Sequence, residues 1–134
     1  MRFWKLFADG ASKGNPGRAG IGAVLIDPDG RTVAYVSEPI GIATNNTAEY
    51  KALIRGMELA LKAGAEYLQV YLDSELLVKQ LTGQYKVRAP HLLPLYREVC
   101  QLQSQFRAIV YQHAPRYANV EADKLASRAA ERGN

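Results

Sequence analysis

The first third of the chain consists of short apolar runs separated by turn-forming residues, a pattern that predicts β-strands. The expected strands are residues 3–8, 20–27 and 32–41. Residues 9–17 are rich in glycine, serine, asparagine and proline and are expected to form a loop. Asp27-Pro28-Asp29-Gly30 is a strong hairpin-turn signal. Strands with such short connections predict an antiparallel meander.

After residue 45 the apolar residues recur at helical spacing, which predicts a helix over Asn46–Ala63. Its apolar face consists of Tyr50, Leu53, Ile54, Met57 and Leu61. Gly64 is expected to end this helix as a left-handed cap. Residues 67–72 form a short apolar run that predicts a central strand, and the preceding helical crossover favours parallel pairing.

The C-terminal half continues to alternate between helical and strand patterns. The expected elements are a helix over 74–81 capped by Ser74, a loop over 82–90, a helix over 91–106 whose start is delayed by Pro94, a strand over 107–112 and a helix over 119–132 capped by Asn119. Together the elements predict an α/β fold with a mixed five-stranded sheet, three antiparallel strands followed by two parallel ones, flanked by helices.

The 134 residues are 48% hydrophobic, enough for one domain with a full core, and no repeat or linker-like stretch divides them. We therefore expect a single domain over residues 1–134. Cys100 is the only cysteine and excludes an internal disulfide. No apolar stretch approaches ~20 residues and no leader is apparent, so we expect a cytoplasmic protein without a membrane partner.

Four acids occupy positions where strand ends and helix starts can converge in such a fold: Asp9, Glu49, Asp73 and Asp123. Each has a simpler structural explanation. Asp9 could cap a turn, Glu49 could close a capping box with Asn46, and Asp73 could be a plain strand-end acid. Asp123 could be favoured by the positive end of the helix dipole. Taken singly, each acid fits its structural explanation better.

The charge balance is basic, with 17 lysines and arginines against 13 acids and a net charge of +4. Without the four acids above, 17 bases stand against 9 acids, a net charge of +8 over the rest of the chain. A basic surface around an acidic cluster suits a polyanion held by its backbone and attacked at one point. A basic protein without such a partner remains an alternative.

Clustered carboxylates repel one another, and bound cations relieve this repulsion. Hard oxygen ligands select Mg²⁺ or Mn²⁺ over zinc, and two such ions can serve a phosphodiester displacement. Zinc spacing is absent, since His91 and His113 lie 22 residues apart and there is one cysteine. The glycine-rich segment after Asp9 lacks the lysine and hydroxyl residue of a Walker loop. These residues indicate a magnesium site that acts on a phosphate ester.

Four blocks of sequence, in order, resemble the type 1 ribonuclease H family. They are Asp9-Gly10-Ala11-Ser12 with Gly14-Asn15-Pro16-Gly17 and Gly20-Ile21-Gly22, then Thr44-Asn45-Asn46-Thr47-Ala48-Glu49-Tyr50, then Asp73-Ser74, and finally His113, Asn119 and Ala122-Asp123-Lys124-Leu125-Ala126. The resemblance covers residues 3 to 130. It implies a ribonuclease H-like fold and hydrolysis of the RNA strand of RNA–DNA hybrids with two Mg²⁺ ions, or Mn²⁺ as a substitute, leaving 5′-phosphate and 3′-hydroxyl ends.

By this resemblance the metal ligands are Asp9, Glu49, Asp73 and Asp123. His113 would lie on a mobile loop near the scissile phosphate and assist proton transfer or product release. Its simpler interpretation is a surface residue at a strand end. Of the four acids, Asp123 is the one that the cation site needs least, because some ion-binding geometries rely on three ligands.

The resemblance and the residue types also indicate nucleic-acid contacts, at Gly10, Ala11, Ser12, Asn15, Asn45, Asn46, Ser74, Asn119, Lys86 and Arg88. Glycines allow close approach to a phosphate, and amides can donate to sugars, phosphates or shallow-groove base edges. Helix capping is the alternative for the Asn45-Asn46 pair. Glu75 stands where several members carry glutamine, and no role is assigned to it.

Some bacterial members insert a basic helix between positions equivalent to Thr82 and Pro90, and this chain resembles the shorter members without it. Lys86 and Arg88 are expected to substitute in part, although an ordinary solvated loop is an alternative. No obligate protein partner is evident, and we expect a monomer. A binding module that keeps the fold without cleavage, or a DNA-processing nuclease of the same fold, are the alternative functions.

Overall fold

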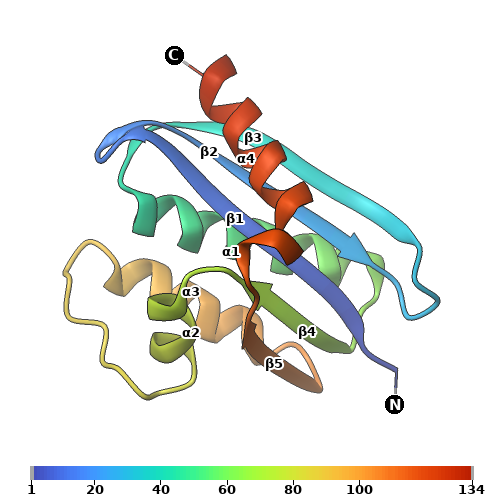
Figure 1. Ribbon diagram of the computed structural model, residues 1–134. Helices are drawn as coiled ribbons and strands as arrows, with labels where there is room; N and C mark the ends of the chain where they lie inside the picture. Colours follow the sequence, from blue (N-terminus) through green and yellow to red (C-terminus); the bar gives the residue numbers. More distant parts are fainter. Residues whose placement is uncertain (1, 134) are drawn as a thin grey trace.

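The computed structural model describes residues 2–133. Its strands are β1 (Trp4–Gly14), β2 (Gly17–Ile26), β3 (Thr32–Ala43), β4 (Tyr67–Leu72) and β5 (Ala108–His113). They form one sheet in the order β3-β2-β1-β4-β5 (Figure 1). The β1–β2 and β2–β3 pairs are antiparallel, whereas the β1–β4 and β4–β5 pairs are parallel. The expected mixed five-stranded α/β sheet is therefore confirmed.

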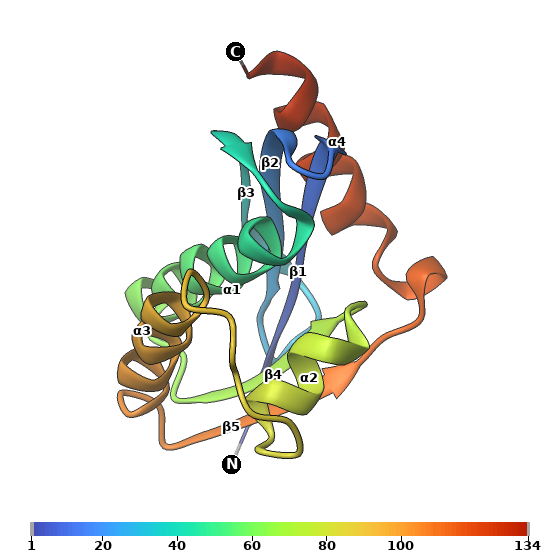
Figure 2. The ribbon, with the colours of Figure 1, turned by 90° about the vertical axis from the view of Figure 1, so that its left-hand side faces the viewer.

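The helices are α1 (Asn45–Ala63), α2 (Glu75–Leu81), α3 (Leu93–Gln103) and α4 (Val120–Arg132), and a 3₁₀ turn, η1 (Arg116–Ala118), precedes α4. The long helix α1, with α3 against it, covers one face of the sheet, and α4 packs on the other face (Figure 2). A buried hydrogen bond joins α1 to α2, where the Tyr50 hydroxyl donates to Gln80 Oε1 over 2.7 Å. Within residues 2–133, none of these helices has the length and apolar character needed to cross a bilayer.

The main core lies between the sheet and α1. Successive side chains of a strand point to opposite faces, so alternate residues of each strand reach this core. The buried set includes Leu6, Ala8, Leu25, Leu53, Met57, Leu68 and Val70. On the opposite face, the rings of Phe7 in β1 and Tyr71 in β4 stack with centroids 4.7 Å apart. The face that carries α4 is thus the less fully covered one.

The segment expected to be a loop, residues 9–17, is mostly strand. β1 continues beyond Asp9 and pairs with β2 as far as Gly14↔Gly17, which leaves Asn15-Pro16, joined by a cis peptide bond, as the turn. The expectation was wrong because residues with turn propensity also adopt extended backbone when a neighbouring strand satisfies their hydrogen bonds. Asp9 therefore lies inside a long strand and not at its end.

The helix starts differ from expectation in two places. α1 begins one residue early, at Asn45, and its cap is the Thr44 hydroxyl, which accepts from Thr47 N at 3.2 Å. Asn46 is consequently inside the helix, and a capping box with Glu49 is excluded. At α4, Asn119 occupies the cap position without a side-chain capping bond. The Ser74 cap of α2 and the left-handed Gly64 at the end of α1 are confirmed.

Candidate active site

Two of the predicted acids are brought together by parallel strand pairing. β1 and β4 run side by side from Trp4↔Leu68 to Ala8↔Leu72, and their pairing stops there. Asp9 is the next residue of β1, and Asp73 directly follows the end of β4, so the two acids lie at the same level of the sheet. Ligand sites in α/β sheets commonly form where parallel strands end and diverge.

The third acid, Glu49, reaches the same point from α1. Carboxylate oxygens of Asp9, Glu49 and Asp73 all lie within 4.8 Å of one another. Gly10 makes this approach possible, because a Cβ at that position would lie 2.4 Å from the carbonyl carbon of Ala48 and 2.5 Å from Glu49 N. No side chain fits between β1 and the second turn of α1, so Gly10 serves helix packing here.

The fourth acid, Asp123, comes from the first turn of α4. It lines the same cavity, but it is outside the tight group of three. After burial and the charge of Asp73, its proximity is a further cause that raises the pKa of Asp9. α4 sits close to the sheet because Gly22 leaves room for it: a Cβ on Gly22 would lie 2.3 Å from the carbonyl oxygen of Ala122.

Burial and mutual repulsion shift the protonation of this cluster. Asp9 is only 4% exposed. Its burial, followed by the charge of Asp73, raises the pKa of Asp9 to about 9. Burial and the same neighbour raise the pKa of Glu49 to about 7, although a hydrogen bond from Ser74 and the positive charge of Arg116 act in the opposite direction. Without cations, Asp9 is therefore mostly protonated at neutral pH and Glu49 is about half protonated.

The four acids line a cavity of about 300 Å³ together with Gly10, Ala11, Ser12, Asn45 and Arg116. Arg116, on η1, was missed in the sequence interpretation. Its only signal was a positive charge between His113 and Asn119, and nothing in the local pattern showed that η1 turns it toward the acids. Its guanidinium is the cation that offsets part of the charge at Glu49.

The predicted nucleic-acid contacts divide into two groups. Gly10, Ala11, Ser12 and Asn45 line the cavity, and Ser74 contacts Glu49. Asn15, Asn46, Lys86 and Arg88 do not line it, and the last two are exposed in the connection between α2 and α3. Asn15 instead ties the β1–β2 turn to α1, because its Oδ1 accepts from Asn45 N at 3.0 Å.

Asn119, expected to contact nucleic acid, is buried in the structure. The residue is 1% exposed, and its side-chain Nδ2 donates to the carbonyl oxygen of Ala8 at 3.2 Å. The side chain is therefore engaged with the backbone of β1.

His113 ends β5, where it pairs with Leu72 of β4, the residue before Asp73. The following residue, Ala114, donates its N–H to the carbonyl oxygen of Leu72 at 2.8 Å. His113 itself is exposed and does not line the acidic cavity. The structure therefore places it beside the strand that leads to Asp73, at the edge of the sheet.

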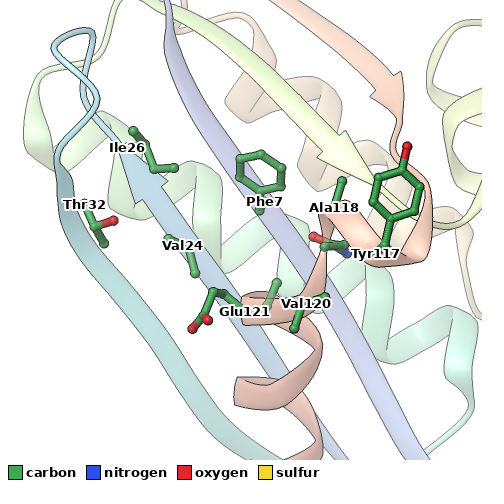
Figure 3. A pocket seen from close by; sticks show the side chains of 10 residues that line it. Phe7, Val24, Ile26, Thr32, Tyr117, Ala118, Val120 and Glu121 are labelled. Atoms are coloured by element: carbon green, nitrogen blue, oxygen red, sulfur yellow. The ribbon is translucent and has the colours of Figure 1, made fainter.

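A second cavity, of about 310 Å³, lies under the start of α4 and is mainly apolar (Figure 3). Phe7, Val24 and Ile26 form its floor on the sheet, and Tyr117 and Val120 border it from the chain above. Glu121 is its only ionisable lining residue apart from the tyrosine phenol. This cavity offers no group for hydrolytic chemistry, so the acidic cavity is the candidate active site.

The donor set of the acidic cavity fits hard divalent cations. Three carboxylates with oxygens within 4.8 Å of one another offer oxygen ligands and a strong negative potential, and Mg²⁺ or Mn²⁺ prefers both. Asp123 could add a further oxygen from α4. Burial, followed by the charge of Asp73, raises the pKa values of Asp9 and Glu49, and bound cations would lower both.

A mixed sheet in the order 3-2-1-4-5 with an Asp–Glu–Asp cluster beside its central strand defines a ribonuclease H-like domain. The sequence agrees, because residues 7–129 match the family described as reverse transcriptase-like. The chain belongs to this family, and it is a homologue of ribonuclease HI.

Two curated relatives illustrate the relationship. The chain is 50% identical over 123 residues to the bifunctional protein Rv2228c of Mycobacterium tuberculosis, which covers 91% of this chain and 34% of the relative. It is 42% identical over 123 residues to ribonuclease HI of Halobacterium salinarum, covering 92% of this chain and 62% of that protein. The chain thus spans about a third of the mycobacterial relative and less than two thirds of the archaeal one.

Solved structures agree closely with this fold. The N-terminal RNase H domain of the M. tuberculosis protein has a TM-score of 0.93 at 46% identity, covering 96% of this chain and 98% of that one. RNase H1 of Halobacterium salinarum gives 0.94 at 40% identity, covering 97% and 98%. LC11-RNase H1, crystallised with an RNA/DNA hybrid, gives 0.91 at 37% identity, covering 96% and 97%.

Proposed function

We propose that this protein is a metal-dependent endoribonuclease that hydrolyses the RNA strand of RNA–DNA hybrids and leaves 5′-phosphate and 3′-hydroxyl ends. The observation that carries the proposal is the cluster of Asp9, Glu49 and Asp73, whose carboxylate oxygens lie within 4.8 Å of one another at the end of parallel strands. The relationship to ribonuclease HI, at 42% identity to the halobacterial enzyme, gives this cluster its chemical context.

The four acids would hold two Mg²⁺ ions, with Mn²⁺ as a substitute. When bound, these ions would polarise the scissile phosphate, activate the attacking water and stabilise the leaving oxygen. The protein's own contribution is to bury Asp9 and Glu49 close to Asp73, which raises the pKa of both acids. Bound cations would lower these pKa values, so binding of the ions and loss of the protons are coupled.

Arg116 supplies the positive charge of the cavity wall. A guanidinium offers donors that match phosphate oxygens, so Arg116 would orient the substrate backbone beside the acids. His113, exposed at the end of β5, would exchange protons with the leaving group or assist departure of the product. Its place beside the β4 residue that precedes Asp73 supports this assignment.

The substrate would be recognised by its backbone and groove shape more than by its sequence. Gly10, Ser12 and Asn45 line the cavity and present small or amide groups to a shallow groove. The Ser12 hydroxyl already donates to the carbonyl oxygen of Ala43 at 2.9 Å, so it would act toward RNA as an acceptor, for instance from a 2′-hydroxyl. The relative crystallised with an RNA/DNA hybrid supports this substrate class.

The test is cleavage of an RNA–DNA hybrid labelled on the RNA strand, with Mg²⁺, resolved on a denaturing gel beside double-stranded RNA and DNA. Asp9→Asn and Asp73→Asn should each abolish cleavage. Asp29→Asn is the matched control, because Asp29 is an exposed acid paired with Arg2 at 2.7 Å and remote from the cavity. Undiminished cleavage by Asp9→Asn or Asp73→Asn would refute the site. Tight hybrid binding without turnover at any Mg²⁺ or Mn²⁺ concentration would establish a binding module instead.

A further inference from the structure

Asn119 makes three hydrogen bonds, two of which lead to the segments that carry Asp9 and Asp123. Its side-chain Nδ2 donates to the carbonyl oxygen of Ala8, the residue before Asp9, at 3.2 Å. Its own carbonyl oxygen accepts from Asp123 N at 3.0 Å, and its N–H donates to the carbonyl oxygen of Arg116 at 3.0 Å. The residue therefore links β1, the first turn of α4 and η1 at a single buried point.

Asn119 contacts β1 at the residue where the pairing of β1 with β4 ends. Ala8 is the last β1 residue that pairs with β4, and Asp9 follows directly. The amide thus binds the strand where β4 departs and the acidic cavity begins. One turn later on α4, Asp123 lines the same cavity as Asp9. The positions of Asp9 and Asp123 are connected through Ala8 and Asn119 over a short, buried path.

Stability alone does not account for Asn119. Its Oδ1 is buried and, among residues 2–133, has no hydrogen-bond partner. A buried polar atom without a partner typically costs about 1–3 kcal/mol, so an asparagine here carries a penalty that an apolar residue would avoid. Helix capping does not explain the asparagine either. Its side chain makes no hydrogen bond to the backbone N–H groups in the first turn of α4.

The rest of α4 is held by other contacts. Gly20 and Gly22 of β2 allow its middle to pack closely on the sheet. Near the middle, the Ser37 hydroxyl donates to the carbonyl oxygen of Leu125 at 2.8 Å, and at the C-terminal end Arg132 Nη2 donates to the carbonyl oxygen of Ser37 at 2.7 Å. These contacts would keep α4 docked without Asn119, and the one that reaches its first turn, Ala122 against Gly22, is packing and not a hydrogen bond.

We propose that Asn119 is a positioning residue that sets the location of Asp123 relative to Asp9, and so completes the fourth side of the cation site. The proposal rests on the proposed function and adds to it a residue that touches neither substrate nor ions. Loss of the amide would leave α4 docked but its first turn free to shift. Asp123 would then meet Asp9 and the ions at the wrong distance.

The test uses Asn119→Ala and Asn119→Leu, the second of which fills the buried volume while removing the donor and the unpaired acceptor. Ser37→Ala is the matched control, since it removes a hydrogen bond between α4 and the sheet and neither Ser37 nor Leu125 lines the acidic cavity. All variants are first compared by thermal unfolding. We expect hybrid cleavage at saturating substrate to fall about tenfold or more in the Asn119 variants and to stay within about twofold in Ser37→Ala.

A double-mutant cycle with Asp123→Asn separates positioning from general destabilisation. If Asn119 acts through Asp123, Asn119→Leu should change the residual rate of Asp123→Asn by less than about twofold. An equal loss in both backgrounds, or normal cleavage by a folded Asn119→Leu, would overturn the proposal.

A second readout does not require turnover. Mg²⁺ titrated calorimetrically into the substrate-free protein should bind roughly tenfold more weakly to Asn119→Leu than to the wild type, as is typical when a group that orients a ligand is removed. Unchanged affinity would contradict the positioning role. If the wild type binds Mg²⁺ but cleaves no hybrid, the proposed function fails, while this titration still tests Asn119.

Discussion

Gly10 of β1 and Glu49 of α1 are packed so closely that a Cβ on the glycine would lie 2.5 Å from the backbone nitrogen of the glutamate. The contact places the second turn of α1 directly on the strand that carries Asp9. The separation of two carboxylates is therefore set by the absence of a side chain between them.

Gly10→Ala should damage the site more than its small size suggests. The added methyl would push α1 away from β1, which costs about 1–3 kcal/mol of stability and displaces Glu49. We expect cleavage to fall at least tenfold, since misplacement by about 1 Å can cost up to 100-fold. Gly30→Ala is the control, because a Cβ at Gly30 would have no other atom within 4 Å. Its φ of +88° makes alanine unfavourable there, so this variant tests backbone strain without a steric clash. Comparable cleavage by both variants, measured on folded protein, would contradict this account.

The metal-free protein should lose stability as the pH rises. The folded state raises the pKa of Asp9 to about 9 and that of Glu49 to about 7, above their ordinary values of about 4. Between these limits the folded state binds more protons than the unfolded state, so the free energy of unfolding falls with pH. The stabilisation from protonation is complete below pH ~4 and is lost as the pH passes through 7 to 9.

Thermal unfolding with EDTA from pH 5 to 9 measures this effect. Asp9→Asn should unfold at a higher temperature than the wild type at pH 9, and its midpoint should vary less with pH. One carboxyl contributes at most about 1.4 kcal/mol per pH unit. Asp29→Asn, at an exposed ion pair, should follow the wild-type profile. If the unfolding midpoints of the wild type and Asp9→Asn changed equally with pH, the pKa of Asp9 would not be raised in the folded state.

Arg116→Ala should weaken binding of a hybrid and reduce its dependence on salt. Removal of one phosphate contact lowers the slope of log K against log salt by about 0.7–0.9. Binding can be measured in the Asp73→Asn background, where cleavage is blocked. A range of about 50 to 200 mM salt is suitable, because contacts between charged groups dominate the change in affinity there. Arg107→Ala is the control, since Arg107 pairs with Glu66 at 2.7 Å near the start of β5. Equal slopes for the two variants would remove Arg116 from the binding surface.

His113→Ala should slow turnover without abolishing it, by about 10- to 100-fold, because general acid–base groups supply a limited share of such catalysis. His91→Ala should be neutral, as His91 is exposed at the start of the segment leading to α3. Single-turnover and steady-state rates on one hybrid substrate distinguish chemistry from product release. An unaltered kcat in His113→Ala would return this residue to the simpler interpretation, a surface residue at a strand end.

Much of the fold could be predicted because the hydrophobic periodicity of its elements is regular. The order of strands and helices, the parallel pairing of β4 and the meeting of Asp9, Glu49 and Asp73 followed from apolar runs and the positions of acids. The extension of β1 beyond Asp9 could not, because it depends on pairing with β2 and not on local propensity. The long-range hydrogen bonds of a partner strand outweighed a segment of turn-forming residues.

The parts of the site that escaped prediction are those set by tertiary contacts. Nothing in the sequence near Arg116 indicates that a 3₁₀ turn will direct it to the acidic cavity. Asn119 carried a recognisable signal, but its side chain could serve a cap, a nucleic acid or a buried carbonyl. Only the enclosure of the residue between α4 and β1 decides among them.

The docking of α4 on its own face of the sheet has a consequence for how the protein opens. Three of the acids belong to elements built around the core that α1 shares with the sheet, whereas Asp123 belongs to a helix on the far side. Partial unfolding proceeds through such separately packed units. Release of α4 would remove one carboxylate and uncover the Phe7 side of the sheet while the Asp9–Glu49–Asp73 group stays assembled. Opening of α4 alone would therefore lower the activity of the protein while its main core stays folded.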